Sequence, residues 1–168
     1  SVEPVQVFVR IRPEYGREGA GSKSCISIVD ESTIRLSVPD GVHGTRKSVS
    51  AVDDKVKLYD RVFPPSTSQE DIYACVTEHV QAAVNGYNAT VFAYGSTGSG
   101  KSHSMTGNSA SPGIIPRAIS EIFSIAETTA AREKDVYFYV RLSYVELYNN
   151  TFRNLFAFTR ETTKDKDK

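Results

Sequence analysis

The sequence is poor in the residue types that mark several common classes of protein. It contains no tryptophan, one methionine and only two cysteines, with Cys25 in a strand-like stretch and Cys75 in a helical pattern. Cysteines so placed support neither a disulfide framework nor a cysteine-based zinc site, and they fit a reducing compartment. The longest uninterrupted apolar run covers residues 136–140, whereas a membrane span needs roughly 18 residues or more. We therefore predict a soluble chain that does not cross a membrane.

Neither sign of charge is in excess. The chain has 20 lysine and arginine residues against 20 aspartate and glutamate residues. This balance argues against nucleic-acid binding or membrane anchoring driven by overall charge. Its 168 residues, of which 39% are hydrophobic, leave room for one ordinary domain with a real core. The chain opens at Ser1 with no leader-like pattern, so we expect a cropped or processed start and predict the localisation from function alone.

Hydrophobic periodicity predicts several short strands and two helices. Alternating apolar residues, or short apolar runs beside turn residues, predict strands, with a hairpin turn at residues 30–32. These strands lie at residues 5–11, 26–28, 34–38, 56–58, 62–63 and 136–148. Loops are expected at residues 14–24 and 39–50, which are rich in glycine and charge.

The clearest helix is predicted over residues 68–85, with apolar residues at the helical period. Ser68 and Asp71 form a plausible capping box at its start, and Gly86 stands where a C-terminal cap would. A second helix is predicted from Pro116 to about Ala131. Residues 89–94, apolar except for Thr90, predict a buried strand in the middle of a sheet.

One motif carries recognisable chemistry. The pattern G-x-x-x-x-G-K-[ST] is satisfied by Gly95, Ser96, Thr97, Gly98, Ser99, Gly100, Lys101 and Ser102. It follows the predicted strand at 89–94, which is the context that a phosphate-binding P-loop requires. The alternative is a flexible Gly/Ser connector, which would not need a Lys-Ser pair at this offset.

The residue types of the loop suit a nucleotide phosphate. The glycines let the backbone turn tightly with its N–H groups pointing inward, at the start of a helix whose dipole favours anions. Lys101 can reach the β- and γ-phosphates, and the Ser102 hydroxyl is placed to ligate Mg²⁺. A P-loop by itself specifies neither the substrate nor the reaction.

The residues around the loop extend the pattern well beyond it. The stretch from Phe92 to Met105 closely resembles the kinesin motor domain, and further blocks follow in that family's order. They are Val9 to Pro13, Tyr59 to Phe63, Ser66 to Tyr73, Gly86 to Thr90, Gly113 to Ala118 and Ser143 to Asn149. An unrelated P-loop kinase or GTPase would leave the first and last of these blocks unexplained. The resemblance implies an α/β P-loop NTPase fold with a central sheet flanked by helices.

The resemblance also implies ligands and partners. In kinesins the Arg-x-Arg-Pro segment and the histidine after the P-loop border the adenine, which makes Arg10, Arg12, Pro13 and His103 candidates for that contact. ATP or ADP with Mg²⁺ would be the cofactors, and microtubules would be the partner, with a cytoplasmic, cytoskeletal localisation. Residues 5–156 would form the N-terminal part of the motor domain, and residues 157–168 a charged, disordered tail.

The resemblance has gaps as well. Kinesins use a serine-rich first switch and an Asp-x-x-Gly second switch to sense the γ-phosphate, and no residue after Ser102 matches either. We therefore assign no catalytic residue, and expect the chain to stop near the middle of the motor domain and to leave the strand at 89–94 with an unpaired side. The alternative to a motor is a non-catalytic nucleotide-binding or scaffolding module. Direction of travel, cargo and oligomeric state are not encoded in these residues.

Several other residues have a structural interpretation that we prefer. Glu146 is expected in a structural strand rather than as a general base, and no role is assigned to His43 or His79. The tyrosines at 137, 139, 144 and 148 are expected to pack in a sheet core or at its edge. Within the matched blocks, Ser96 replaces a common glutamine, Ser102 a threonine, and Asn150 and Asn154 common acidic residues.

Overall fold

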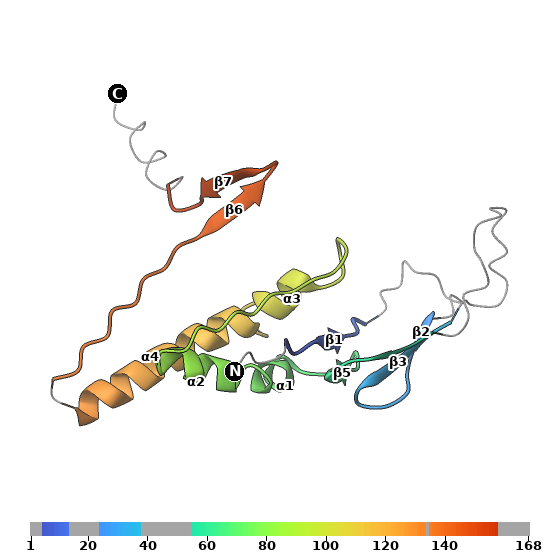
Figure 1. The fold of residues 1–168 in the computed structure, drawn as a ribbon, viewed down its shortest axis with the longest axis horizontal. Coiled ribbons are helices and arrows are strands. Elements are labelled where there is room, and N and C mark those ends of the chain that lie inside the picture. Colours follow the sequence, from blue (N-terminus) through green and yellow to red (C-terminus); the bar gives the residue numbers. More distant parts are fainter. Residues whose placement is uncertain (1–4, 14–23, 38–54, 134, 158–168) are drawn as a thin grey trace. The chain divides into compact units, whose positions relative to one another are not determined.

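The computed structural model describes residues 5–13, 24–37, 55–133 and 135–157. These residues belong to two compact units, Ser1–Ile125 and Ala126–Lys168. Their helices and strands are shown in Figure 1. The loops predicted at 14–24 and 39–50, the tail predicted at 157–168, and His43 lie wholly or almost wholly outside the described residues.

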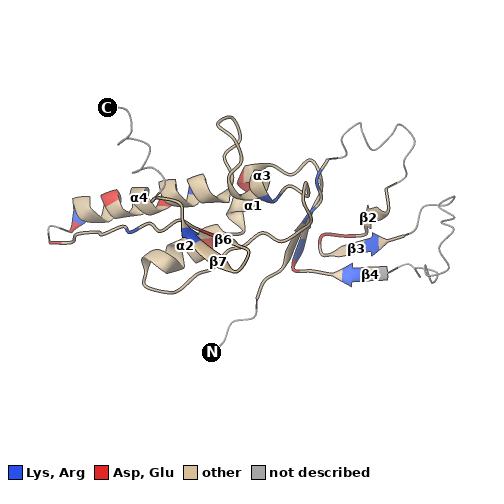
Figure 2. Ribbon diagram, turned by 90° about the horizontal axis from the view of Figure 1, so that it is seen from above, with Lys and Arg blue, Asp and Glu red and all other residues tan. Residues whose placement is uncertain are grey.

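The first unit begins with two small sheets. Strand β1 (Phe8–Arg10) pairs in parallel with β5 (Arg61–Phe63), with Arg10 opposite Phe63. Strands β2 (Ile26–Ile28), β3 (Thr33–Leu36) and β4 (Lys55–Leu58) form an antiparallel sheet in that order. The hairpin predicted around residues 30–32 is confirmed. Strands β3 and β4 carry basic residues (Figure 2).

The predicted helix at 68–85 is present but interrupted. It consists of α1 (Gln69–Ala74) and α2 (Thr77–Val84). The N–H of Val76 donates to the Tyr73 carbonyl at 2.8 Å, a bond over three residues instead of four, and the Thr77 hydroxyl donates to the same carbonyl at 3.3 Å. Adjacent β-branched residues and a hydroxyl that competes for a helix carbonyl both disfavour a continuous helix at this point.

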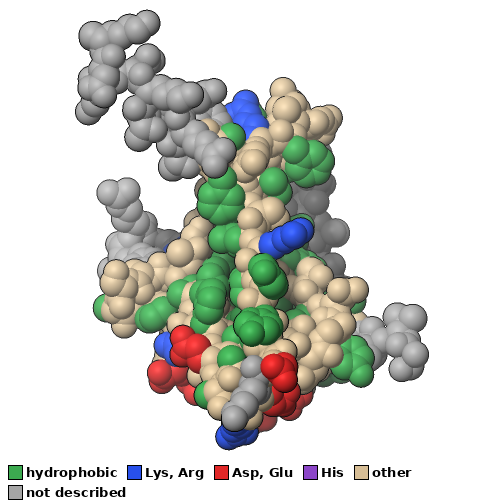
Figure 3. All heavy atoms as spheres, turned by 90° about the vertical axis from the view of Figure 1, so that its left-hand side faces the viewer, with side chains coloured by type: hydrophobic (Ala, Val, Ile, Leu, Met, Phe, Trp, Pro, Cys, Tyr) green, Lys and Arg blue, Asp and Glu red, His purple; other side chains and the backbone are tan. Residues whose placement is uncertain are grey.

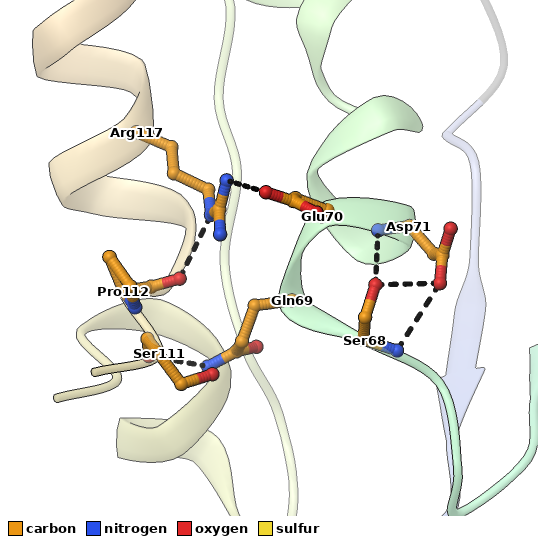
Figure 4. Close-up of polar contacts among 7 residues, drawn as sticks. All are labelled: Ser68, Gln69, Glu70, Asp71, Ser111, Pro112 and Arg117. Carbon is orange, nitrogen blue, oxygen red and sulfur yellow. Dashed lines mark hydrogen bonds and ion pairs between the residues drawn. The ribbon is translucent and has the colours of Figure 1, made fainter.

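Both ends of the interrupted helix are capped as predicted. The Ser68 hydroxyl accepts from the Asp71 N–H at 3.1 Å, and the Asp71 carboxylate accepts from the Ser68 N–H at 3.3 Å and from its hydroxyl at 2.6 Å (Figure 4). These hydrogen bonds lower the pKa of the Asp71 carboxyl. At the other end Gly86, with a φ of 96°, donates to the Ala83 carbonyl at 3.1 Å.

The remaining helices are α3 (Lys101–Met105) and α4 (Ile114–Arg132), and the second begins two residues before the predicted Pro116. Among the described residues, no helix is both long enough and apolar enough to cross a bilayer. Few apolar side chains of the described chain are buried: Ile34, Val62, Phe63, Ile72, Val76, Val80 and Ala126.

The prediction of a buried strand at residues 89–94 is wrong for this structure. The described residues form no strand there, and the side chains of Phe92 and Tyr94 are 72% and 96% exposed. A central strand exists only where neighbouring strands satisfy its N–H and C=O groups, and no described strand does so for this segment. The described strands accordingly form three separate sheets and no single central one.

The second unit holds a hairpin where a longer strand was predicted. Strand β6 (Val145–Tyr148) pairs antiparallel with β7 (Thr151–Asn154), while residues 136–144 are not in a strand. Asn149 and Asn150 have φ angles of 48° and 56°, as a two-residue type I′ turn requires. Glu146, which faces Arg153 in this register, lies in a strand as expected.

The tyrosines of this unit are not packed in a core. Tyr137 and Tyr139 are 84% and 94% exposed, so the expectation of sheet packing fails for them. Tyr144 contacts the Phe156 ring at 6.0 Å between centroids, and the Arg153 guanidinium lies 5.4 Å from the Tyr148 ring. Hydrophobic side chains are visible at the surface in the space-filling view (Figure 3).

Tyr73 links α1 to α4 by a hydrogen bond that depends on pH. Its hydroxyl donates to the Glu121 carboxylate, and burial followed by this bond raises the pKa of the tyrosine. The unfolded tyrosine ionises first, so the stabilisation is complete below pH about 10 and is lost above it. We expect the urea-denaturation midpoint to fall more between pH 8 and pH 11 in the wild type than in Tyr73→Phe. The exposed control Tyr87→Phe should follow the wild type; a Tyr73→Phe curve that also follows it would contradict this link.

Candidate functional site

The motif residues form a loop that leads directly into a helix. Gly100 is the residue before α3, with a φ of 102° that favours glycine. The Ser104 N–H donates to the Gly100 carbonyl at 3.0 Å, which closes the first turn of the helix. The N–H groups of Lys101 and Ser102 are in this first turn, where a helix offers them no carbonyl acceptor. The loop-to-helix half of the predicted context is therefore present, although the preceding strand is not.

Lys101 folds back over the loop. Its ammonium donates to the carbonyls of Gly95 and Ser96, both at 2.8 Å. An ammonium has three N–H donors, so this geometry places a partly buried positive charge at the mouth of the loop with donor capacity beyond these two bonds. The loop thus combines unpaired amides of a helix start with a cation, which is what an anionic ligand requires.

Ser102 is the second residue of α3 and its side chain is exposed. Its carbonyl accepts from the N–H groups of Thr106 at 2.8 Å and Gly107 at 3.0 Å. These bonds occupy the backbone and leave the hydroxyl oxygen, which is the kind of hard ligand that Mg²⁺ prefers, at the surface. The residue therefore fits a magnesium ion bound together with phosphate oxygens.

Two of the predicted adenine contacts are brought together by the fold. The Arg10 guanidinium, at the end of β1, lies 3.4 Å from the His103 imidazole on α3. Its NH1 group also donates to the Ser104 hydroxyl at 2.9 Å. Half-burial lowers the pKa of Arg10. Arg12 and Pro13 lie two and three residues after the end of β1, the first half-buried and the second exposed.

Gln69 is a residue of this region that the sequence analysis missed. Its amide oxygen accepts from Arg10 NH1 at 2.7 Å, and its amide nitrogen donates to the His103 carbonyl at 2.6 Å. The same nitrogen donates to the Ser111 carbonyl at 3.4 Å (Figure 4). The side chain is only 5% exposed. Nothing in the sequence marks it, because a glutamine after a helix cap usually faces solvent.

The far end of α3 rests against Gly113. A Cβ atom added at this buried position would lie 2.6 Å from the Ser104 carbonyl oxygen and 2.7 Å from that of Met105. Backbone atoms at these distances cannot yield without moving the helix. Gly113 is thus the position that lets α3 approach the loop before α4.

We expect Gly113→Ala to lower the free energy of unfolding by about 1–3 kcal/mol, the usual cost of overpacking. Urea denaturation measures it directly. Ser109→Ala, in the same loop but exposed, is the matched control and should change the stability by less than about 0.5 kcal/mol. Equal stability of the two variants would show that α3 does not pack on Gly113.

Comparison with known proteins agrees with these features. The family model of the kinesin motor domain matches residues 10–168. Kinesin-like protein KIN-7G of Oryza sativa subsp. japonica is 38% identical over 154 residues, which cover 91% of this chain and 15% of that protein. Kinesin-like protein Klp61F of Drosophila melanogaster is 37% identical over 179 residues, which cover 98% of this chain and 15% of that protein.

A third relative, Kinesin-like protein 2 of Schizosaccharomyces pombe, is 30% identical over 164 residues, covering 98% of this chain and 19% of that protein. The chain thus spans between 15% and 19% of the length of these three relatives. Since the family model covers nearly every residue, including the loop and the Arg10 segment, the chain belongs to the kinesin motor domain family.

Proposed function

We propose that this chain is the ATP-binding part of a microtubule-based motor, with its nucleotide site at residues 95–102. The observation that carries the proposal is the loop itself, which turns into α3 with the Lys101 ammonium over its carbonyls. Family membership supports a nucleotide as the anion. Residues 5–156 would form the N-terminal part of the motor domain.

Each residue of the site would have a distinct task. The N–H groups of the loop and of the α3 first turn would hold the β-phosphate, and Lys101 would exchange its carbonyl partners for phosphate oxygens. The Ser102 hydroxyl would be a ligand of Mg²⁺, whose chemistry is to offset the charge of the phosphates. Arg10, Arg12, Pro13 and His103 would border the adenine, because planar guanidinium groups and a proline ring pack on a base without reading its edges.

The motor activity belongs to the whole protein. In the proposal, hydrolysis of ATP changes the affinity for microtubules, and microtubule binding in turn changes the affinity for nucleotide by the same factor. Kinesin-like relatives that are 30–38% identical to this chain over 91–98% of its length support this function. A cytoskeletal localisation follows from the same proposal.

Nucleotide binding is tested by a thermal-shift titration of the 168-residue chain with Mg·ADP and Mg·ATP. A ligand that binds only the native state raises the melting temperature by an amount that grows with the logarithm of its concentration above its dissociation constant, so a concentration-dependent increase is expected. Omission of Mg²⁺ should reduce the shift, because Ser102 then loses the ion that joins it to the phosphates. A melting temperature that is unchanged at millimolar nucleotide would contradict the proposal.

A further inference from the structure

One buried polar side chain near the candidate site makes no hydrogen bond with the loop. Gln69 is 5% exposed and is one of two buried polar residues among those described. Its three hydrogen bonds reach the end of β1, the third residue of α3 and the loop before α4. A buried amide has a directional oxygen and nitrogen, so it fixes both partners only in one orientation.

The partners of Arg10 explain why this orientation matters. Within the described residues, the guanidinium donates to the oxygen atoms of Gln69 at 2.7 Å, Ser104 at 2.9 Å and Thr67 at 3.4 Å. All three are neutral, and the shortest bond is the one to Gln69. Among the residues that the structure describes, the position of this cation beside His103 therefore depends on hydrogen-bond geometry and not on an ion pair.

The Gln69 amide also binds His103, the residue beside Arg10. Its nitrogen donates to the backbone carbonyl of His103 at 2.6 Å, so one side chain contacts both Arg10 and His103. None of its hydrogen bonds is with residues 95–102, and the two bonds of Lys101 are made without it. Gln69 thus bonds to both residues of the adenine side and makes no hydrogen bond with the loop.

We propose that Gln69 is a positioning residue for the base-binding side of the nucleotide site, holding Arg10 and His103 in place before the nucleotide arrives. The inference rests on the proposed nucleotide site. Gln69 would strengthen adenine binding without contacting the base. Side chains that are already in place avoid the entropic cost of being ordered when the nucleotide binds.

The test separates the two ends of the ligand. Dissociation constants of Mg·ATP and of Mg·tripolyphosphate, which has the three phosphates without adenosine, are measured by calorimetry for wild type and Gln69→Met. We expect the variant to bind Mg·ATP about tenfold more weakly, which is the loss of about one net hydrogen bond to a charged group. Tripolyphosphate binding should change by less than about twofold, because its site is the loop.

Two further variants complete the test. Gln81→Met is the matched control, because it makes the same substitution at an exposed glutamine whose amide donates to Glu121 at 3.0 Å, and it should bind both ligands as the wild type does. Gln69→Glu keeps an oxygen for Arg10 and should recover part of the ATP affinity. Circular dichroism at the working temperature confirms that each variant is folded.

The outcomes distinguish the proposals. If Gln69→Met weakens ATP and tripolyphosphate by the same factor, or neither, the positioning role is overturned while the nucleotide site stands. If Gln69→Glu binds ATP no better than Gln69→Met, the bond from Gln69 to Arg10 does not contribute to ATP binding, and that part of the inference is overturned. If the wild type binds neither ligand, the proposed nucleotide site itself fails, and this inference fails with it.

Discussion

Replacing Lys101 by alanine is expected to weaken Mg·ATP binding by about 10- to 100-fold, since hydrogen bonds to a charged group contribute about 1.5–3 kcal/mol and a factor of ten is about 1.4 kcal/mol. The ammonium is already within the loop, at 2.8 Å from the Gly95 and Ser96 carbonyls, so no rearrangement of the chain is needed to bring it to a phosphate. Calorimetric titration of Mg·ATP into both proteins measures the change.

The same substitution should have little effect on the protein without ligand. It removes two bonds to carbonyls, and Ser96 is exposed, so water can replace the lost donor there. Lys57→Ala, on the exposed surface of β4, is the matched control for loss of a positive charge and should leave the affinity for ATP unchanged. Equal weakening by both variants would mean that nucleotide binds by general charge attraction and not in the loop.

Lys101→Arg adds a test of geometry. The guanidinium keeps the positive charge but is planar and larger than an ammonium, and it would have to fit between the loop carbonyls. We expect most of the affinity to be lost here as well. A variant with nearly normal affinity would indicate that the charge alone, and not the three-donor ammonium at this position, holds the phosphates.

The sequence predicted best those features that depend on neighbouring residues along the chain. The capping box at Ser68, the cap at Gly86 and the hairpin after Ile28 are each decided within a few residues, and all three are present. The glycine turn into α3 is of the same kind. Local hydrogen bonds and backbone preferences determine such features, so periodicity and residue type are sufficient to find them.

Features that depend on distant partners were predicted less well. An apolar run such as residues 89–94 becomes a buried strand only if other strands supply its hydrogen bonds, and the run itself carries no information about whether they are present. The same holds for the strand predicted at residues 136–148, of which only Val145–Tyr148, next to the Asn149 turn, forms a strand. The turn had a local signal, two consecutive asparagines, which favour positive φ.

The candidate site shows both cases. The loop was found from its spacing, and the approach of Arg10 to His103 was expected from the family resemblance. Gln69 was not found, because its importance comes from contacts to residues 59 and 34 positions away in the sequence. Only a structure brings such positions together, and burial of a neutral amide has no signature in residue type.

Phe63→Ala is expected to lower the free energy of unfolding by about 3–5 kcal/mol, the usual cost of truncating a buried phenylalanine. The side chain is 3% exposed and contacts the Phe8 ring at 6.1 Å between centroids. The Arg61 guanidinium covers the ring at 5.2 Å. Total stabilities are about 5–15 kcal/mol, so this one change should remove about a fifth or more of the stability of the chain.

Phe92→Ala provides the comparison, because it removes the same atoms from a side chain that is 72% exposed. We expect its effect on the free energy of unfolding to be within about 0.5 kcal/mol of zero. Urea denaturation of the two variants tests whether residues 89–94 are buried, as the sequence pattern predicts, or exposed, as in the structure. If Phe92→Ala costs as much as Phe63→Ala, residues 89–94 are buried in solution as their pattern indicates. A small effect of Phe92→Ala beside a large effect of Phe63→Ala would show that the segment before the loop is exposed in solution and is not packed in a sheet.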